Sequence, residues 1–160
     1  MKILIVSDTH RSHSTLTEVV DREKPLDMMI HLGDVEGGEY YISSLVSCPM
    51  HIIAGNNDFF TDLPREQEFF IGKYRAFITH GHKYYVSRGE SALKNAARQR
   101  MVDIVMYGHT HVPVIREEDG LVILNPGSLT YPRQMGRKPS YIIMNIKSDG
   151  KAEYEIKYIE

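Results

Sequence analysis

Residues 2–10 read KILIVSDTH, an aliphatic run that ends in the small polar cluster Asp8-Thr9-His10. The run is continuous rather than alternating, which is typical of a strand that is buried on both faces of a sheet. Four later apolar runs end in the same way, and the clusters after them are Gly33-Asp34, Gly55-Asn56-Asn57-Asp58, His80-Gly81-His82 and Gly108-His109-Thr110-His111. In an open α/β sheet, ligands bind outside the carboxyl ends of the strands, so we expect all five clusters along one edge.

Between these runs the sequence predicts three helices. The first opens at a capping box formed by Thr15 and Glu18 and ends before Pro25, and the second covers residues 39–46. The third covers residues 89–100, and its inward stripe is expected to contain Leu93, Ala96, Ala97 and, at its end, Met101.

The strands are expected to be parallel at first and antiparallel later. They are predicted at residues 2–7, 27–32, 50–54, 68–71, 74–79, 103–107, 112–116, 121–124, 141–146 and 153–158. Tight turns are predicted at Gly72-Lys73, Asp119-Gly120 and Asp149-Gly150. An α/β half followed by a β-rich half predicts two packed sheets with helices outside, in a single domain over residues 1–160.

Composition narrows the class of protein. The net charge of −2, from 19 basic and 21 acidic residues, gives no overall attraction to nucleic acid or to a membrane surface. The single cysteine, Cys48, rules out an intrachain disulfide and a thiolate-rich zinc site. No segment is apolar enough to cross a membrane, and we expect a cytoplasmic protein.

The side chains in the five clusters are those that hold hard-to-borderline divalent metals. Asp8 and His10 are two residues apart, so on an extended segment they point the same way, and the same holds for His109 and His111. Asp34 can bridge two metals, because a carboxylate offers one oxygen to each. Any one cluster alone is better explained as a turn or a surface histidine, but their joint occurrence favours a metal site.

In this order the clusters resemble the calcineurin-like metallophosphoesterases. The short length and the Thr-His-Gly-His and Asn-Pro-Gly-Ser elements (79–82 and 125–128) resemble the compact bacterial and archaeal phosphodiesterases, whose eukaryotic relative is the small retromer subunit. The resemblance implies a four-layer α/β/β/α sandwich of two mixed sheets flanked by helices. It also implies a first metal on Asp8, His10, Asp34 and His111. A second metal would lie on Asp34, Asn56, His80 and His109, with Asp34 bridging the two.

Two positions depart from patterns seen in the superfamily. Asn57 stands where larger members have a histidine; an amide can donate a hydrogen bond to a phosphoryl oxygen but cannot deliver a proton. Arg11 stands where glycine is usual, and it either clamps the substrate phosphate or points to solvent. From the resemblance and these two positions, the candidate catalytic residues are Asn57, Asp34 and His80. The candidate substrate contacts are Asn57 and Arg11. His82 is expected either to support the metal ligands or to lie at the surface.

The resemblance implies a metal-dependent phosphodiesterase that acts through a metal-bridging hydroxide on a small phosphodiester substrate. We expect diesters over monoesters, because a monoester adds negative charge next to Asp34 and Asp58. The donor set suits Mn²⁺ best, with Fe²⁺, Zn²⁺ or Ni²⁺ able to replace it. Two alternatives stay open, a non-catalytic scaffold like the retromer subunit and a nuclease, although the charge balance argues against tight nucleic-acid binding. Tyrosine-bearing strands late in the chain are a candidate interface for a homo-oligomer.

Overall fold

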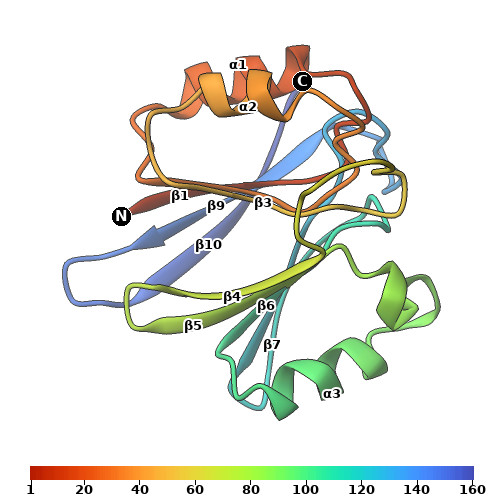
Figure 1. The fold of residues 1–160 in the computed structure, drawn as a ribbon. Coiled ribbons are helices and arrows are strands. Elements are labelled where there is room, and N and C mark those ends of the chain that lie inside the picture. The colour runs from red at the N-terminus through yellow and green to blue at the C-terminus, as the bar shows by residue number, and fades with distance from the viewer.

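The computed structural model describes residues 1–160 and contains two mixed sheets of five strands each (Figure 1). In spatial order the first sheet is β10 (Ala152–Tyr158), β9 (Ser140–Ile146), β1 (Lys2–Val6), β2 (Met28–His31) and β3 (Met50–Ile52). The second is β4 (Glu66–Ile71), β5 (Tyr74–Thr79), β6 (Ile104–Met106), β8 (Leu121–Pro126) and β7 (Pro113–Glu118). β1, β2 and β3 run parallel to one another, as do β5, β6 and β8, while the remaining pairings are antiparallel.

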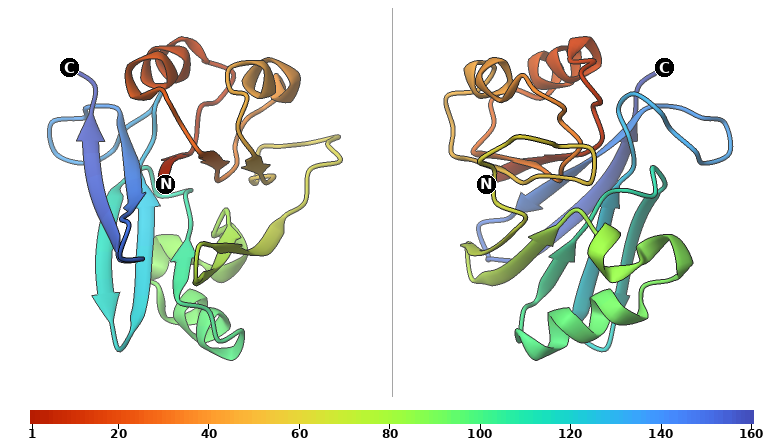
Figure 2. Two further views of the ribbon diagram at one scale, coloured as in Figure 1. Left: turned by 90° about the vertical axis from the view of Figure 1, so that its left-hand side faces the viewer. Right: turned by 45° about the vertical axis from the view of Figure 1, so that its right-hand side comes forward.

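The helices cover the outer faces of the two sheets (Figure 2). α1 (Ser14–Glu23) and α2 (Glu39–Ser44) pack on the first sheet, and α3 (Ser91–Gln99) packs on the second. Two short 3₁₀ turns, η1 (His82–Tyr84) and η2 (Val86–Arg88), precede α3. The architecture is therefore the expected four-layer α/β/β/α sandwich. None of these helices is long and apolar enough to span a bilayer.

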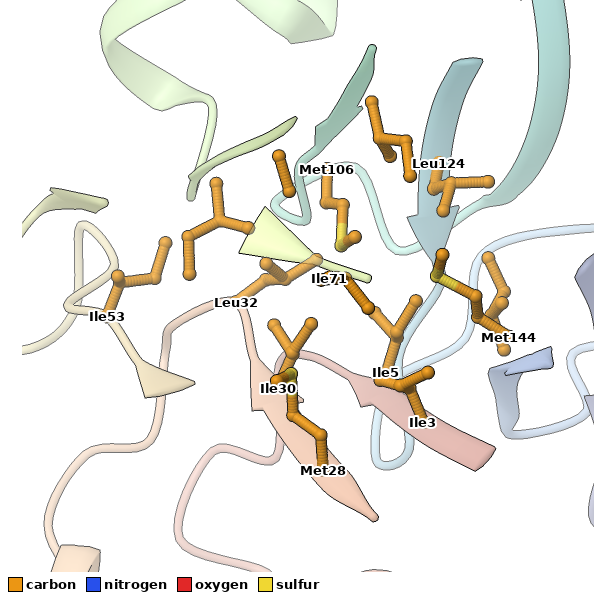
Figure 3. Close-up of a cluster of buried hydrophobic side chains, with 14 residues drawn as sticks. Ile3, Ile5, Met28, Ile30, Leu32, Ile53, Ile71, Met106, Leu124 and Met144 are labelled. Atoms are coloured by element: carbon orange, nitrogen blue, oxygen red, sulfur yellow. The ribbon is translucent and has the colours of Figure 1, made fainter. Parts of the chain in front are cut away.

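Side-chain alternation along β1 explains why its sequence is apolar throughout. Ile3 and Ile5 point into the core between the two sheets, together with Ile30 of β2 and Met106 of β6 (Figure 3). Leu4 and Val6 point the other way, into a second core beneath α1 and α2. Because successive residues of a strand face opposite sides, a strand with a core on each side needs apolar residues at every position.

Two details of the predicted helices are wrong. Thr15 does not open α1, because the helix begins at Ser14 after His13, which places Thr15 inside the first turn where it cannot cap. Met101 is not on the inward stripe of α3 but is 78% exposed. The helix ends at Gln99, and Met101 takes a positive φ that turns the chain away from the helix axis.

The two sheets also do not correspond to the two halves of the sequence. β9 returns to the first sheet and pairs antiparallel with β1, and β10 extends that sheet beyond β9. Residues 140–144 of β9 are all buried, as expected for a strand with apolar cores on both faces. The second sheet takes the middle of the chain, and β8 pairs there in parallel with β6 rather than only antiparallel with β7.

Candidate metal centre

All five polar clusters follow the carboxyl ends of parallel strands, as predicted. Three follow β1, β2 and β3 of the first sheet, and two follow β5 and β6 of the second. Because the two sheets pack face to face, the carboxyl ends of both sets meet at one end of the sandwich, and loops far apart in sequence come into contact there.

A first group of candidate ligands lies where the β1 loop meets the β6 loop. The Nε2 atom of His111 is 3.0 Å from Oδ1 of Asp8 and 3.3 Å from Nε2 of His10. The His10 Nε2 atom is 3.6 Å from the same Asp8 oxygen. One donor atom from each of these three residues therefore falls within 4.8 Å of the others.

A second group lies beside the first and shares Asp8 with it. It consists of Asp8, Asp34 and His80. The His80 Nε2 atom is 3.4 Å from Oδ2 of Asp34, 3.0 Å from Oδ1 of Asn56 and 3.9 Å from Oδ1 of Asp8. The same Asp34 oxygen is 3.7 Å from Nε2 of His10. The carboxylates of Asp8 and Asp34 thus both lie between the two groups of imidazoles.

Three imidazoles of the site are oriented by hydrogen bonds from their outer nitrogen. His80 Nδ1 donates to the carbonyl oxygen of Leu32 at 2.7 Å, and His111 Nδ1 donates to that of Tyr131 at 2.7 Å. His10 Nδ1 lies 2.8 Å from a carboxylate oxygen of Glu36. Since a carbonyl or carboxylate oxygen only accepts, each Nδ1 carries the hydrogen, and the lone pair of the neutral ring is on Nε2. This arrangement is the usual support of a metal-binding histidine.

The candidate ligands do not lie on extended backbone. Positive φ values are found at Asp8, His10, Asp34, His109 and His111. The left-handed region is uncommon for residues with a Cβ, and clusters of such residues mark functional sites. The predicted reason why Asp8 and His10 reach one site, an extended segment, is therefore wrong. Left-handed loop residues turn both side chains inward instead.

Hydrogen bonds between loops hold this backbone in place. The amides of Asp8 and His10 donate to the carbonyl oxygens of Gly33 and Asp34 at 3.0 and 2.9 Å. The Asn-Pro-Gly-Ser element closes the other side, because the Ser128 hydroxyl donates to the Asp8 carbonyl at 2.8 Å. Asn125 Nδ2 donates to the carbonyl oxygen of Gly108 at 3.0 Å, which fixes the loop that leads to His109.

Two glycines are required by close approach. A Cβ at Gly55 would collide with the carboxylate of Asp34, and a Cβ at Gly108 would collide with the side chains of Ser7 and Asp8. Glycine at these positions lets the backbone of two loops pack directly against the acidic side chains.

Without a bound metal, burial and ion pairing shift the pKa values of the site residues in opposite directions. Burial lowers the pKa of His80, but its hydrogen bond to Asp34 and the charges of Asp8 and Asp34 outweigh burial and raise that pKa to about 9. Burial raises the pKa of Asp8, but hydrogen bonds from His10 and His111 and the charge of His80 hold it well below its usual range. Protons on imidazole thus compensate the two acids in the metal-free protein, and a divalent cation would replace them.

The remaining predicted site residues lie around this centre. Asn57 donates from its backbone amide to Oδ1 and from Nδ2 to Oδ2 of Asp34, both at 2.9 Å. The His109 ring centroid is 5.1 Å from that of His80, and its amide donates to Asp8 Oδ2 at 3.1 Å. The ring of His82 lies 5.5 Å from that of His80, and its Nδ1 is buried without a hydrogen-bond partner. Arg11 is exposed, and its guanidinium makes no hydrogen bond or ion pair.

The supporting roles of three residues were not predicted from the sequence. Glu36 orients His10, as described above. His31 is fully buried beneath the site, where its Nδ1 accepts from the Gly33 amide and its Nε2 contacts the Thr9 hydroxyl at 3.0 Å. Asp58 is 2% exposed and accepts from the amides of Gly55, Val35 and Glu36. The sequence placed Asp58 next to the substrate phosphate, which is wrong, because its buried carboxylate binds the backbone amides of two loops instead.

The donor set fits divalent metals of the hard-to-borderline class. It combines carboxylate and amide oxygens with imidazole nitrogens, contains no thiolate, and has donor atoms close enough to share an ion. Hydrogen bonds from Nδ1 direct the Nε2 lone pairs of His80 and His111 toward these donor atoms rather than toward solvent. The left-handed loop residues bring their side chains to the same place. The residues present therefore fit a metal site.

Comparison with known proteins places this site in a family. Residues 1–149 match the family model of the calcineurin-like phosphoesterase superfamily domain. The chain belongs to this superfamily, and the fold and the order of its clusters agree with that assignment.

Individual relatives are similar over most of their length. The chain is 30% identical over 150 residues to the probable metallophosphoesterase YsnB of Bacillus subtilis, covering 93% of this chain and 86% of the relative. It is 32% identical over 145 residues to a phosphodiesterase of Methanocaldococcus jannaschii, covering 79% and 83%. Among solved structures, wild-type Vps29 of Entamoeba histolytica complexed with Zn²⁺ superposes with a TM-score of 0.77 at 26% identity, covering 99% of each chain.

Proposed function

We propose that this chain is a phosphodiesterase that uses two divalent metals. One metal is held by Asp8, His10, Asp34 and His111, and the other by Asp34, Asn56, His80 and His109. The observation that carries the proposal is the orientation of three histidines: Nε2 of His10 and of His80 faces both Asp8 and Asp34, and Nε2 of His111 faces Asp8. When bound, such metals supply a nucleophile from water at neutral pH and Lewis acids for the phosphoryl oxygens.

Asn57 fixes the orientation of the Asp34 carboxylate at this centre. Asn57 occupies both oxygens of Asp34, so the plane of that carboxylate is set by two hydrogen bonds. Because its amide is already engaged there, Asn57 is better placed to position Asp34 than to contact a leaving group. An amide also has no proton to give at neutral pH. We therefore expect efficient hydrolysis only of esters whose leaving group is stable as an anion.

Similarity, rather than charge, supports diesters over monoesters. Two divalent cations would outweigh the charges of Asp8 and Asp34, so these carboxylates alone do not repel a second negative charge. Asp58 does not repel it either, because three backbone amides compensate its buried carboxylate. The relative from Methanocaldococcus jannaschii that bears the name phosphodiesterase supports the same class of substrate. The donor set favours Mn²⁺ among the available metals.

A non-catalytic scaffold is the second candidate, and the similarity to Vps29 is the observation in its favour. Against it stands the full set of seven candidate ligands, together with the hydrogen bonds that orient them. A scaffold that acts only by binding partners at its surface does not require the strained left-handed backbone found at five of these seven ligand positions.

The test compares bis(p-nitrophenyl) phosphate with p-nitrophenyl phosphate in the presence of Mn²⁺. We expect kcat/KM for the diester to exceed that for the monoester by about tenfold or more, which corresponds to about 1.4 kcal/mol of transition-state stabilisation. A better rate on the monoester would refute the diesterase proposal. Failure to hydrolyse either ester with any of the four metals would favour the scaffold.

A further inference from the structure

A hollow of about 550 Å³ lies next to the metal centre, on the loop between β8 and β9. This loop projects from the body of the molecule (Figure 2). Five residues line the hollow, and none of them is acidic: Thr130, Tyr131, Pro132, Arg133 and Arg137. The hollow is a feature of shape and charge that the assignment of metal ligands does not use.

Residues that line the hollow contact the candidate ligands. The Tyr131 ring centroid lies 5.3 Å from that of His10, and the carbonyl oxygen of Tyr131 accepts the Nδ1 hydrogen of His111. The Arg133 amide donates to the His111 carbonyl oxygen at 3.0 Å. The Thr130 hydroxyl donates to the Thr9 carbonyl at 2.8 Å. A substrate whose phosphorus lies at the metal centre therefore has this hollow as its neighbour on one side.

Two positive charges in the hollow have no partner within the protein. Arg133 and Arg137 are exposed, and neither guanidinium makes an ion pair or a side-chain hydrogen bond. The adjacent Lys138 differs, because its ammonium lies 3.2 Å from the carboxylate of Glu160. Most other arginines of the chain face a carboxylate, as Arg22 faces Glu18. Guanidinium groups bind phosphate through paired hydrogen bonds, so two free ones beside a phosphoesterase site suit an anionic ligand.

Tyr131 gives the hollow a flat apolar wall. Its side chain is 57% exposed, and it is held by the contacts of its backbone with His111 and of its ring with His10. An exposed aromatic face that is already ordered is suited to stacking on a planar ring.

We propose that the hollow between Tyr131, Arg133 and Arg137 binds a phosphorylated arm of the substrate, with Tyr131 stacking on a ring beside that phosphate. The substrate class is then a phosphodiester with one arm that carries both a planar ring and a further phosphate, as a phosphorylated nucleoside does. The inference rests on the proposed phosphodiesterase function and specifies its substrate.

The experiment uses two substrates that differ by one phosphate. They are the p-nitrophenyl phosphodiester of thymidine and the same compound with an additional phosphate on the other sugar hydroxyl. We expect the wild-type protein to prefer the phosphorylated compound, mainly through a lower KM. Arg133→Gln and Arg137→Gln should each lower kcat/KM for it by about tenfold and leave the unphosphorylated compound within about twofold.

A matched control removes an arginine elsewhere. Arg98 on α3 is also exposed, and it faces Asp119 in the turn at the other end of the second sheet. Arg98→Gln should leave both substrates unchanged. Tyr131→Leu should raise KM for both thymidine compounds, since stacking of one base is worth roughly a tenfold change, whereas Tyr131→Phe, which keeps the ring against His10, should not.

The outcomes separate this inference from the function on which it rests. Lack of preference for the phosphorylated compound, or a preference that survives both arginine substitutions, would overturn the subsite. If no diester is hydrolysed at all, the proposed function fails, and calorimetric titration of the protein in the presence of Mn²⁺ with thymidine bisphosphate decides the subsite alone. Binding that the double arginine variant weakens by about tenfold or more would support it, and equal or absent binding would overturn it.

Discussion

His80 Nδ1, at the end of β5 in the second sheet, donates a hydrogen bond of 2.7 Å to the carbonyl oxygen of Leu32, at the end of β2 in the first sheet. This contact crosses the sandwich at the point where Nε2 of the same ring faces Asp34 and Asn56. The position of a candidate metal ligand is thus set by the packing of two sheets. The hydrogen bond also determines which nitrogen is free to bind.

Removing a candidate metal ligand should strongly lower activity without unfolding the protein. We expect Asp34→Asn and His80→Ala to lower metal-dependent turnover of an aryl phosphodiester by at least about 100-fold, because each loses a donor or charge that the metals require. Circular dichroism and a cooperative thermal transition would report an intact fold. His51 of β3, whose ring contacts Gln67 and stacks on Phe69 rather than on a candidate ligand, provides the control, and His51→Ala should retain turnover within about threefold. Wild-type-like turnover in either ligand variant would disprove the assignment.

Glu36 should matter for metal affinity although it is not itself a predicted ligand. Its carboxylate holds His10 Nδ1 at 2.8 Å, so Glu36→Ala frees the ring to rotate. Loss of such a supporting group typically weakens metal binding by about 10- to 100-fold. Isothermal titration with Mn²⁺ measures the effect, with Glu18→Ala on the exposed face of α1 as the matched control. Equal affinities in the two variants would show that His10 is oriented by other means.

Metal binding should release protons and strengthen as the pH rises. Burial lowers the pKa of His80, but the hydrogen bond to Asp34 and the charges of Asp8 and Asp34 raise it to about 9, so below that pH the metal-free ring is largely protonated. Each released proton makes the apparent affinity about tenfold stronger per pH unit, up to about pH 9. Titrations in buffers of different ionisation enthalpy count these protons. An affinity that is constant between about pH 6 and 8, with no proton release, would contradict this electrostatic description.

Acid stability should depend on an ion cluster away from the site. Burial raises the pKa of Glu23, but hydrogen bonds from Lys2, Tyr141 and Lys157 outweigh burial and lower it to about 2. A depressed carboxylate pKa stabilises the folded state above the unfolded-state value of 4.5, and this contribution is lost as the pH falls from there toward 2.

We therefore expect Glu23→Gln to lower the free energy of unfolding at neutral pH by about 2 kcal/mol. Below about pH 4.5 the difference from wild type should shrink, because the unfolded wild-type chain then gains a proton on Glu23 that the folded protein does not take up until the pH approaches 2. Urea denaturation at a series of pH values measures both, and the exposed Glu18→Gln serves as the reference. A difference that does not change with pH would mean that Glu23 acts through packing rather than charge.

Local sequence pattern was sufficient to predict the strands and their polar ends. The continuous apolar run of residues 2–6 reflects the two cores that β1 separates, and the cluster after each parallel strand lies where the topology of such sheets places ligands. The positions of the strands and of their polar ends depend on residues that are close together in the sequence, so they can be predicted from local sequence alone.

Contacts between loops that are far apart in the sequence could not be predicted from local sequence. Glu36 supports His10 from 26 residues away, and the Asn-Pro-Gly-Ser element reaches back 120 residues to Asp8. The left-handed backbone at Asp8 and His10 is imposed by such contacts, since local preference disfavours it for residues with a Cβ. The place of β9 beside β1 is likewise a long-range choice, which alternation within one strand does not reveal.

We propose that the seven clustered side chains bind two divalent metals that are required to cleave phosphodiesters. Metal analysis of the purified protein, coupled to turnover of bis(p-nitrophenyl) phosphate before and after chelation and with Mn²⁺ restored, tests this proposal. We predict about two metal equivalents per chain at saturation, loss of turnover on chelation and recovery with Mn²⁺. A protein that binds no divalent metal, or one that hydrolyses the diester equally well after complete chelation, would contradict the claim.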